Sequence, residues 1–431
     1  MATRNHHVCF VVPPYLLSAI SDSEHNDAPT RESARHALDH HKKYTGKRTK
    51  RFAELTLPRG ARGAAAAHPR QNIVPNHMLK HIAESEDVDE NTRACAKRDL
   101  EHIQKVNAKY VTSQGLKRDT SDQKTLAATE EAPSHTVQTY RAVYDAKNDQ
   151  DEADLPGTVV RVEGQKASKD EAVNEAYDNA GKVLSFYADI FNWKSIDNKN
   201  AHVISSVHFG EKYENAFWDP EIAQMVYGDG STFLTNFTGA VDVIGHELTH
   251  AVTEYTSPLD YTGQSGALNE HVSDVFGIMV KQRVQNETAD KADWLIGEDC
   301  LAPGVKGVAL RSMKAPGTAY DDPRFGKDPQ PDNFSKFESN YDDDNGGVHL
   351  YSGIPNKAFY LASVAFGGYS WEKAGKIWWE TMNSGQVAAK VTFIQFADVT
   401  VDKAEELFGA DAGTIVREAW TDVGVVRKSS T

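Results

Sequence analysis

The hydrophobic and polar positions along the chain follow two different patterns. Residues 137–145, 157–163 and 201–209 have the short β-branched and aromatic runs that predict strands. From residue 242 onward, apolar residues recur every three or four positions, as on one face of a helix. The chain therefore predicts an α+β fold, with a β-rich half followed by a helical half. Helices are expected at residues 170–190, 242–255, 354–365, 371–383, 391–407 and 412–423.

A repeat precedes these two halves. Residues 12–43 align without a gap on residues 74–105. Each copy predicts two short helices, the first starting after its proline and the second near a Thr-Arg pair. Two copies are too few for a solenoid, so we interpret them as two small helical units in tandem. The identical pairs include Val12/Val74, Pro13/Pro75, Leu17/Leu79, Ile20/Ile82, Thr30/Thr92, Arg31/Arg93, Leu38/Leu100 and His40/His102.

These patterns divide the chain into a leader, a connector and two larger halves. The connector is polar and lacks periodicity, so we expect it to be exposed and to contain a processing site. The segments are residues 1–57 (leader unit 1), 58–70 (linker), 71–118 (leader unit 2), 119–135 (connector), 136–255 (β-rich half) and 256–431 (helical half).

Charge separates the leader from the rest of the chain. Residues 1–118 hold 20 Lys and Arg against 13 Asp and Glu, whereas residues 119–431 hold 27 against 49. A basic leader on an acidic body suggests that the two attract one another, the alternative being that both are solvated surfaces. The acidic body argues against nucleic-acid binding. Membrane binding has no basic amphipathic helix to support it.

Length and cysteine content narrow the class of protein further. A chain of 431 residues predicts two or three domains, and no apolar run is long enough to span a bilayer. Cys9, Cys95 and Cys300 are too few and too scattered for a disulfide framework or a cysteine zinc site. The N-terminal apolar stretch is interrupted at Pro13 and Pro14 and lacks a signal-peptide pattern. We therefore expect a protein that is cytoplasmic or exported by a non-classical route.

The expected helix 242–255 carries a metal-binding motif, HELTH. His246 and His250 are four residues apart, so both imidazoles project from one face of the helix toward a tetrahedral zinc ion. Glu247 lies beside them, where it can act on a metal-bound water without binding the metal. For the motif alone, the alternative is a surface helix with two solvated histidines.

A second helix supplies a third ligand. Glu270 follows His250 by twenty residues, in the segment GALNEHVSDVFG. Two histidines, one glutamate and a water form an open catalytic zinc site, whereas structural zinc usually has four protein ligands. His271 points elsewhere on the helix and is not expected to bind the metal. The expected hydrogen-bond partners of the histidine ligands are Asp274 for His246 and Asn269 for His250.

Four motifs together resemble those of the thermolysin family of zinc metallopeptidases, in that family's order and spacing. They are HELTH, GALNEHVSDVFG, NAFWDP…MVYGDG (215–230) and DNGGVHLYSGIPNKAFY (344–360). The leader resembles that of the protealysin-like subgroup, whose short pro-segments carry a PPYLL motif, present here at residues 13–17. The second copy, with VPNHML at residues 74–79, departs from that subgroup, in which one unit is expected.

The resemblance implies a two-domain metalloendopeptidase with one catalytic zinc ion, made as a self-processing precursor. It implies cleavage on the N-terminal side of apolar residues, with Glu247 as the general base acting on a zinc-bound water. By matched position it implies His246, His250 and Glu270 as zinc ligands, Tyr261 and His349 as oxyanion donors, Asp344 as the partner of His349, and substrate binding by Asn215, the backbone of Ala216, and Arg311.

The same resemblance implies a specificity pocket and at most one weak calcium-binding site. Phe237 stands where a smaller aliphatic residue is usual, so we expect a preference for smaller apolar side chains after the scissile bond. Lys281 and Leu295 stand where two glutamate calcium ligands are expected, so we expect at most one weak calcium site. The pocket residues are Phe233, Phe237, Val243, Ile296, Leu310 and Arg311, and the possible calcium ligands are Asp242, Asp293 and Glu298.

Alternatives remain open for the enzyme and for its leader. A zinc aminopeptidase shares the metal motif but needs a Gly-x-Met-Glu-Asn stretch, which the chain lacks. A catalytically silent binding protein would require a leader that is never removed. The expected partners are peptide or protein substrates and the leader itself, as an inhibitor of the cleft, a folding aid or a binding module. A Cys9 thiolate on the zinc is less favoured than an inert cysteine.

Overall fold

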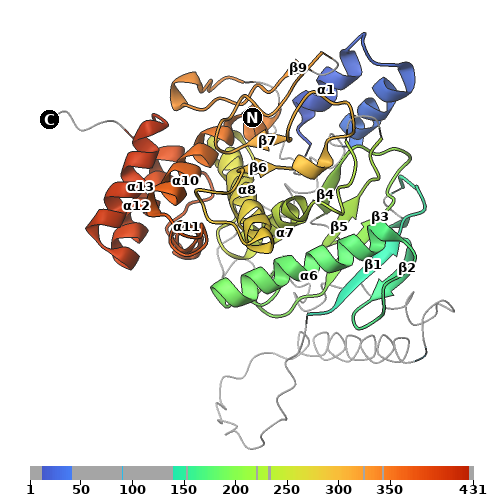
Figure 1. Cartoon of the computed structure of the whole chain (residues 1–431), viewed down its shortest axis with the longest axis horizontal. Coiled ribbons are helices and arrows are strands. Elements are labelled where there is room, and N and C mark those ends of the chain that lie inside the picture. The colour runs from blue at the N-terminus through green and yellow to red at the C-terminus, as the bar shows by residue number, and fades with distance from the viewer. Residues whose placement is uncertain are drawn as a thin grey trace, which may run out of the picture.

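The computed structural model describes part of leader unit 1 and most of the two halves that follow (Figure 1). We call residues 139–426 the body. Strands dominate its first part and helices its second, which confirms the expected α+β fold. The described residues are 12–40, 90 and 139–426, without 152–153, 220–221, 232–233, 324–325 and 342–343.

The β-rich half contains a five-stranded sheet with the order β2-β1-β3-β5-β4. β1, β3 and β5 run parallel, whereas β2 and β4 are antiparallel to their neighbours and form the edges. An edge strand has backbone groups that are able to pair with an extended peptide, so β4 is a candidate binding edge. The strands are β1 (Arg141–Asp145), β2 (Thr158–Val162), β3 (Val203–Val207), β4 (Ala216–Asp219) and β5 (Gln224–Tyr227).

α6 (Glu171–Phe191) packs along this sheet (Figure 1). Its start is capped by Asp170, whose side chain accepts a hydrogen bond from the amide of Val173. Its end is set by Asn192, which adopts the left-handed conformation that commonly terminates helices. The helix buries its apolar face against the sheet and leaves its charged face outside.

Two long helices, α7 (Val241–Tyr255) and α8 (Gly263–Gln285), cross in the centre of the body (Figure 1). A Cβ added to Gly245 would lie 3.0 Å from the Cα of Gly277, and one added to Gly277 would lie 2.5 Å from the carbonyl oxygen of Asp242. Because neither position has room for a side chain, glycine is required for this close approach. Side chains next to the crossing therefore meet between the two helices.

The C-terminal helices pack on the side of α8 away from the sheet (Figure 1). Their interior is aromatic: the indoles of Trp378 and Trp420 stack with 6.2 Å between ring centroids. The helices are α9 (Asp344–Tyr351), α10 (Gly353–Phe366), α11 (Ala374–Asn383), α12 (Phe393–Phe408) and α13 (Ala410–Asp422). Between α8 and α9 lie the short strands β6 (Leu295–Ile296), β7 (Arg311–Ser312), β8 (Asp321–Asp322) and β9 (Gly326–Lys327), and the 3₁₀ turns Glu298–Cys300 and Phe334–Lys336.

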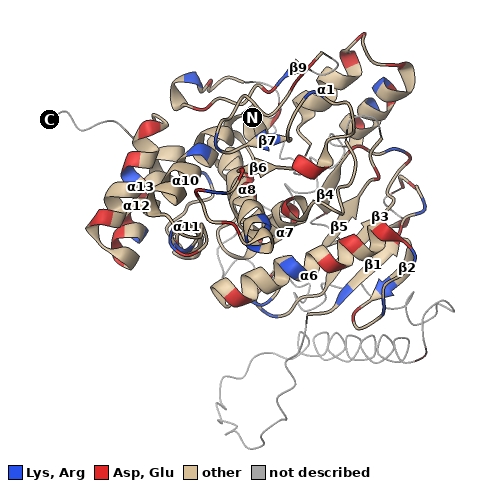
Figure 2. Ribbon diagram, in the orientation of Figure 1, with Lys and Arg blue, Asp and Glu red and all other residues tan. Residues whose placement is uncertain are grey.

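Acidic side chains line the outside of α6 and the C-terminal helices α12 and α13 (Figure 2). A second set of carboxylates lies inside the protein on α7 and α8: Asp242, Glu247, Glu270 and Asp274 are each at most 3% exposed. A buried carboxylate is stable only with hydrogen bonds, an opposite charge or a metal ion as a partner. The crossing of α7 and α8 is therefore where a functional site is to be sought.

Leader unit 1 lies against the body beside β4 and β9 (Figure 1). α1 (Pro14–Asp22) starts after Pro13, with a proline in its first turn where no N–H is needed. Leu17 and Ile20 of this helix are at most 1% exposed. Residues 28–40 are helical as well, so the two short helices expected for unit 1 are confirmed.

The helices expected from the sequence agree with the observed ones to within a few residues in the body. The linker 58–70, the connector 119–135 and, apart from residue 90, unit 2 (71–118) lie outside the described residues. Within the described part of the chain, no helix combines the length and the apolar character needed to cross a membrane.

Candidate active site

One group of side chains in the described part of the chain is positioned to hold a metal ion: His246, His250 and Glu270. The Nε2 atoms of the two histidines are 3.1 Å apart, and Glu270 oxygens lie 3.4 Å from His246 Nε2 and 3.8 Å from His250 Nε2. Ligands bound at about 2.0–2.1 Å to a tetrahedral zinc ion are roughly 3.3 Å apart. The three expected ligands are thus brought together at separations that fit zinc.

Both histidines are oriented by hydrogen bonds at their other ring nitrogen. His246 Nδ1 lies 2.8 Å from Asp274 Oδ1, and His250 Nδ1 lies 2.7 Å from Asn269 Oδ1. An oxygen acceptor at Nδ1 keeps the proton on that atom and leaves the Nε2 lone pair available for a metal ion. Asp274 and Asn269 are the two partners predicted from the sequence.

Asp274 is fully buried and receives hydrogen bonds from several sides. Arg311 donates from Nε to Oδ2 at 2.9 Å and from Nη2 to Oδ1 at 2.7 Å, and Asn356 Nδ2 donates to Oδ2 at 2.8 Å. Burial alone would raise the pKa of Asp274, but Arg311 and His246 outweigh it and hold that pKa well below its ordinary value. Asp274 is therefore a stable anion that fixes His246.

His271, which follows the ligand Glu270, belongs to this hydrogen-bond network. Its Nδ1 lies 2.8 Å from Asn356 Oδ1, and its Nε2 accepts a hydrogen bond from Trp378 Nε1 at 2.7 Å. Burial lowers the pKa of His271 to about 4, so the ring is neutral and its proton lies on Nδ1. Hydrogen bonds therefore run in one direction from Trp378 through His271 and Asn356 to Asp274.

Glu247, the expected general base, is tied to the edge strand β4. Its Oε2 accepts a hydrogen bond from the backbone N–H of Trp218 at 3.0 Å, and its side chain is 0% exposed. A carboxylate held beside a metal site is suited to take a proton from a water molecule and return it to a leaving amine. The hydrogen bond also links the motif helix α7 to the edge that is able to hold an extended chain.

Tyr261 and His349, the expected oxyanion donors, lie beside the ligand Glu270. The Tyr261 hydroxyl donates to Glu270 and lies 3.4 Å from His349 Nε2. His349 Nε2 in turn lies 3.4 Å from Glu270 Oε2. Two donors next to a metal site are placed to stabilise negative charge that develops on a carbonyl oxygen.

Asp344 holds His349, as expected. Its Oδ1 lies 2.7 Å from His349 Nδ1, and its Oδ2 accepts a hydrogen bond from the His349 backbone amide at 2.8 Å. The carboxylate reaches both groups because the backbone turns in the left-handed region, with φ of 49° at Asp344, 56° at Asn345, 83° at Gly346 and 77° at Gly347. Asp, Asn and Gly tolerate this conformation best, which accounts for the DNGG sequence.

Asn215, expected to hold a substrate chain, holds the leader. Its Oδ1 accepts a hydrogen bond from the Val12 backbone N–H at 3.0 Å, and its Nδ2 donates to the Val12 carbonyl oxygen at 3.2 Å. The Ala216 amide donates to the same Oδ1 at 2.9 Å and so fixes the side-chain orientation. The backbone of unit 1 therefore lies where the backbone of a substrate is expected.

The charge of this docked stretch differs from the charge of the whole leader. Residues 12–40 hold five acidic residues and two basic ones, Arg31 and Arg35. The contacts described for this stretch are mainly apolar side chains and backbone hydrogen bonds. Attraction between a basic leader and an acidic body therefore does not account for the docking of these residues.

The expected specificity pocket stays a prediction. Phe233 lies outside the described residues, and Phe237 lines a separate cavity of about 330 Å³ that also contacts His208. Arg311 directs its guanidinium to Asp274, so it supports a metal-ligand partner. The remaining expected pocket residues, Val243, Ile296 and Leu310, are buried with at most 1% exposure.

The three possible calcium ligands lie around an ammonium group. Lys281 Nζ is 3.2 Å from Asp293 Oδ2 and 3.0 Å from Glu298 Oε2. Burial lowers the pKa of Lys281, but the carboxylates of Asp242, Asp293 and Glu298 outweigh it and raise that pKa. Lys281 thus supplies from within the chain the positive charge that calcium would bring, and calcium at these residues stays a prediction.

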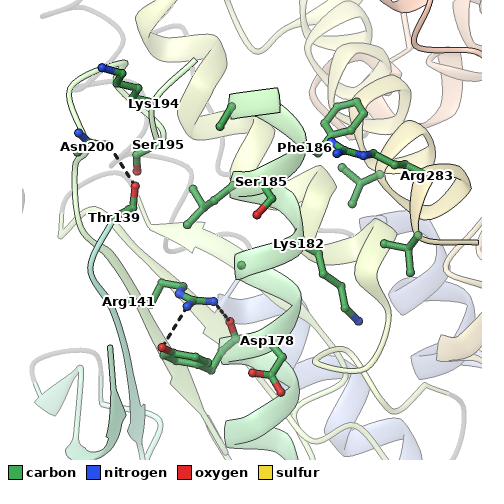
Figure 3. A pocket seen from close by; sticks show the side chains of 16 residues that line it. Thr139, Arg141, Asp178, Lys182, Ser185, Phe186, Lys194, Ser195, Asn200 and Arg283 are labelled. Carbon is green, nitrogen blue, oxygen red and sulfur yellow. Dashed lines mark hydrogen bonds between the residues drawn. The ribbon is translucent and has the colours of Figure 1, made fainter. Parts of the chain in front are cut away.

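A larger cavity, of about 910 Å³, lies on the outer side of α6 (Figure 3). Its charged lining includes Arg141, Asp178, Lys182 and Arg283, and Arg141 donates hydrogen bonds to the carbonyl and hydroxyl oxygens of Tyr177. Neither a metal-ligand candidate nor the expected base lines it. The catalytic chemistry therefore belongs to the α7–α8 crossing.

Comparison with known families agrees with this geometry. The profile described as "Thermolysin metallopeptidase, catalytic domain" matches residues 100–254, and "Thermolysin metallopeptidase, alpha-helical domain" matches residues 257–425. A third profile, "Protealysin propeptide", matches residues 71–115. The chain belongs to the thermolysin family of metallopeptidases, and it is a zinc-dependent endopeptidase made as a precursor.

Individual relatives share most of their length with this chain. It is 43% identical to Protease PrtS of Photorhabdus sp. (strain Az29) over 358 residues, which cover 82% of this chain and 92% of the relative. It is 43% identical to an extracellular metalloprotease of Pectobacterium carotovorum subsp. carotovorum, covering 83% and 97%. Its structure is similar to the precursor of protealysin from Serratia proteamaculans, with a TM-score of 0.65 and 44% identity, covering 82% and 99%.

Several residues of the site carried no usable signal in the sequence. The Trp218 amide, Asn356 and Trp378 act through contacts between segments far apart in the chain. Ser273 Oγ, 3.0 Å from His250 Nδ1, is a further partner that spacing alone does not reveal. Only His271 carried a hint, as a histidine that follows a predicted ligand.

We predict that Asp274→Asn weakens zinc binding by about 10- to 100-fold, because the neutral amide holds His246 less firmly. Competition with a coloured zinc chelator measures the affinity directly. Asp344→Asn is the matched control: it makes the same chemical change beside His349, which is not a ligand, so turnover should fall while zinc affinity stays unchanged. Equal zinc affinity of the Asp274→Asn and wild-type proteins would contradict this role.

We predict that added calcium leaves the melting temperature of the zinc-loaded wild-type protein unchanged and raises that of Lys281→Glu. The variant replaces the ammonium with a fourth carboxylate, and ligand at 100 times its Kd adds about 2.7 kcal/mol, or roughly 5 °C for a domain of this size. Lys291→Glu, the same charge change at an exposed position, is the control and should not respond. A calcium-dependent wild-type melting temperature would show that Lys281 does not replace the ion.

Proposed function

We propose that the mature protein hydrolyses peptide bonds on the N-terminal side of small apolar residues, and that unit 1 blocks the cleft until self-cleavage removes the leader. The observation that carries this proposal is the pair of hydrogen bonds between Asn215 and the backbone of Val12. With the leader docked, Glu247 and His349 are 0% exposed and Tyr261 is 2% exposed. While Val12 occupies Asn215, a substrate backbone is unable to make these two hydrogen bonds.

The chemistry follows from the positions of the side chains. When bound, zinc lowers the pKa of a water molecule and polarises the scissile carbonyl group. Glu247 takes the proton of the attacking water and passes it to the leaving amine. Tyr261 and His349 donate hydrogen bonds to the carbonyl oxygen as it becomes negative, and Asp344 keeps the His349 ring oriented.

We predict that purified full-length protein gains activity toward a quenched peptide as its leader is lost, and that Glu247→Ala lowers turnover at least about 100-fold. Mass spectrometry of the chain follows processing during the same time course. Glu254→Ala, the same substitution on the same helix, is the control and should process and hydrolyse normally. A peptide series with Ala, Val, Leu or Phe after the scissile bond tests the pocket, and equal cleavage of all four would contradict the preference for small side chains.

We predict that a peptide of residues 12–43 inhibits the processed enzyme competitively, raising KM and leaving kcat unchanged. Leu17→Asp in the peptide should weaken inhibition at least about 100-fold, because it places a charge at a position that is 0% exposed in the docked leader. Ala28→Asp adds the same charge at an exposed position and should inhibit like the parent peptide. If both variant peptides inhibit like the parent peptide, or if inhibition changes only kcat, unit 1 does not bind in the cleft.

A further inference from the structure

The second copy of the leader repeat has no role in the proposal so far, yet it matches the first copy where unit 1 touches the body. In α1, Leu17 and Ile20 are at most 1% exposed, and just before α1 the Val12 backbone is held by Asn215. Contacts to backbone groups do not depend on the side chain, so any chain of matching shape is able to make them. Unit 2 keeps the three apolar residues as Val74, Leu79 and Ile82.

The second helix of unit 1 has its own contacts. The Ser33 hydroxyl donates to the Lys212 carbonyl oxygen at 2.5 Å. The His40 ring packs edge-on against Phe209 and Tyr213, with centroids 5.3 and 5.4 Å apart. We call Lys212, Asn215, Phe209 and Tyr213 the docking surface.

Unit 2 matches part of this second set of contacts in sequence. His40 corresponds to His102, and Ala34, which is 1% exposed, corresponds to Ala96. The turn between the helices of unit 1 is closed by Asp27, whose Oδ1 accepts a hydrogen bond from the Thr30 amide at 2.9 Å. Unit 2 has the same two residues, Asp89 and Thr92, and the propeptide profile matches this copy, at residues 71–115.

We propose that residues 74–102 are an alternative occupant of the docking surface, which bind there when unit 1 is displaced. The precursor then has two inhibitory segments in series over one cleft, and loss of unit 1 alone does not expose it. This inference rests on the docking of unit 1 at Asn215, as set out in the proposed function.

Two substitutions make unit 2 the weaker occupant. Ala37 is 0% exposed in unit 1, and Asp99 takes its place in unit 2. A carboxylate at a buried position costs free energy unless it finds a partner. Tyr15, whose side chain packs against the apolar core, is replaced by His77. Unit 1 therefore holds the surface while both copies are present, as the structure shows.

Chain length permits the exchange. Residues 103–138 join unit 2 to the body, and a fully extended segment of that length spans roughly 120 Å. A body of this size has a radius of gyration of about 19 Å. Unit 2 is therefore able to reach the docking surface of its own chain.

A native thiol in unit 2 makes the proposal testable without an activity assay. Cys95 corresponds to Ser33, so a docked unit 2 places its thiol beside Lys212. The experiment uses the full chain with Glu247→Ala to prevent processing, Cys9→Ser to remove the other leader thiol, and Lys212→Cys as the reporter. A short thiol-to-thiol crosslinker is added, and peptide mapping by mass spectrometry quantifies the product joining positions 95 and 212.

We expect little of this product while unit 1 is intact. Leu16→Asp with Leu17→Asp, which expel unit 1, should raise its yield at least about tenfold. Adding Leu79→Asp, the matching change in unit 2, should return the yield to its starting level. Mixing isotopically labelled and unlabelled chains shows whether the product forms within one chain. No rise on expelling unit 1, or a product formed only between chains, would overturn the proposal.

Two further variants of the chain distinguish a failure of this proposal from a failure of the docking of unit 1. The variant with Ser33→Cys, Lys212→Cys and Cys95→Ser measures the docking of unit 1. If positions 33 and 212 do not crosslink, the docking of unit 1, on which both proposals rest, is refuted. A site-specific protease sequence inserted within residues 58–70 releases unit 1 after folding, so a folding defect of the aspartate variants does not decide the outcome. After that cleavage the 95–212 product should increase as it does in those variants.

Discussion

The close approach of α7 and α8 at Gly245 and Gly277 is the constraint on which the site depends. Two of the zinc ligands lie on α7 and the third on α8, and their ligand atoms are 3.1 to 3.8 Å apart. Metal–ligand distances vary by only about 0.2 Å, so small shifts of one helix against the other matter. A single methyl group at Gly277, 2.5 Å from a backbone oxygen of α7, would separate the two ligand sets.

This crossing also concentrates charge inside the protein. Asp274 is balanced by Arg311, and Lys281 is balanced by a ring of carboxylates. Removing one partner of such a buried pair typically costs about 3–5 kcal/mol, because the other charge is left without compensation. The apolar interior around Trp294, Trp378 and Trp420 offsets the desolvation of these groups. The helical half is therefore the support that allows a charged centre to be buried.

The sequence predicted those features that depend on residues close together in the chain or on a known motif. Helical periodicity located α7, and the spacing of His246 and His250 on one helix face was sufficient to predict two ligands. The segment GALNEHVSDVFG indicated the second ligand helix, α8. The Trp218 amide, Asn356 and the position of the Lys281 ammonium were not predictable in this way, because each depends on how distant segments pack. The role expected for Phe237 rests on a matched position alone, and the structure adds that this residue lines a cavity with His208.

The covalent link between the leader and the body changes what a cut in the leader means. A tethered segment faces its binding site at an effective concentration in the millimolar range, whatever the concentration of the protein. Cleavage alters none of the contacts at Asn215, but it turns a first-order equilibrium into a second-order one. Under the proposed inhibition, a precursor cut between residues 119 and 135 stays closed where it is concentrated and opens on dilution, so that a fall in protein concentration activates it.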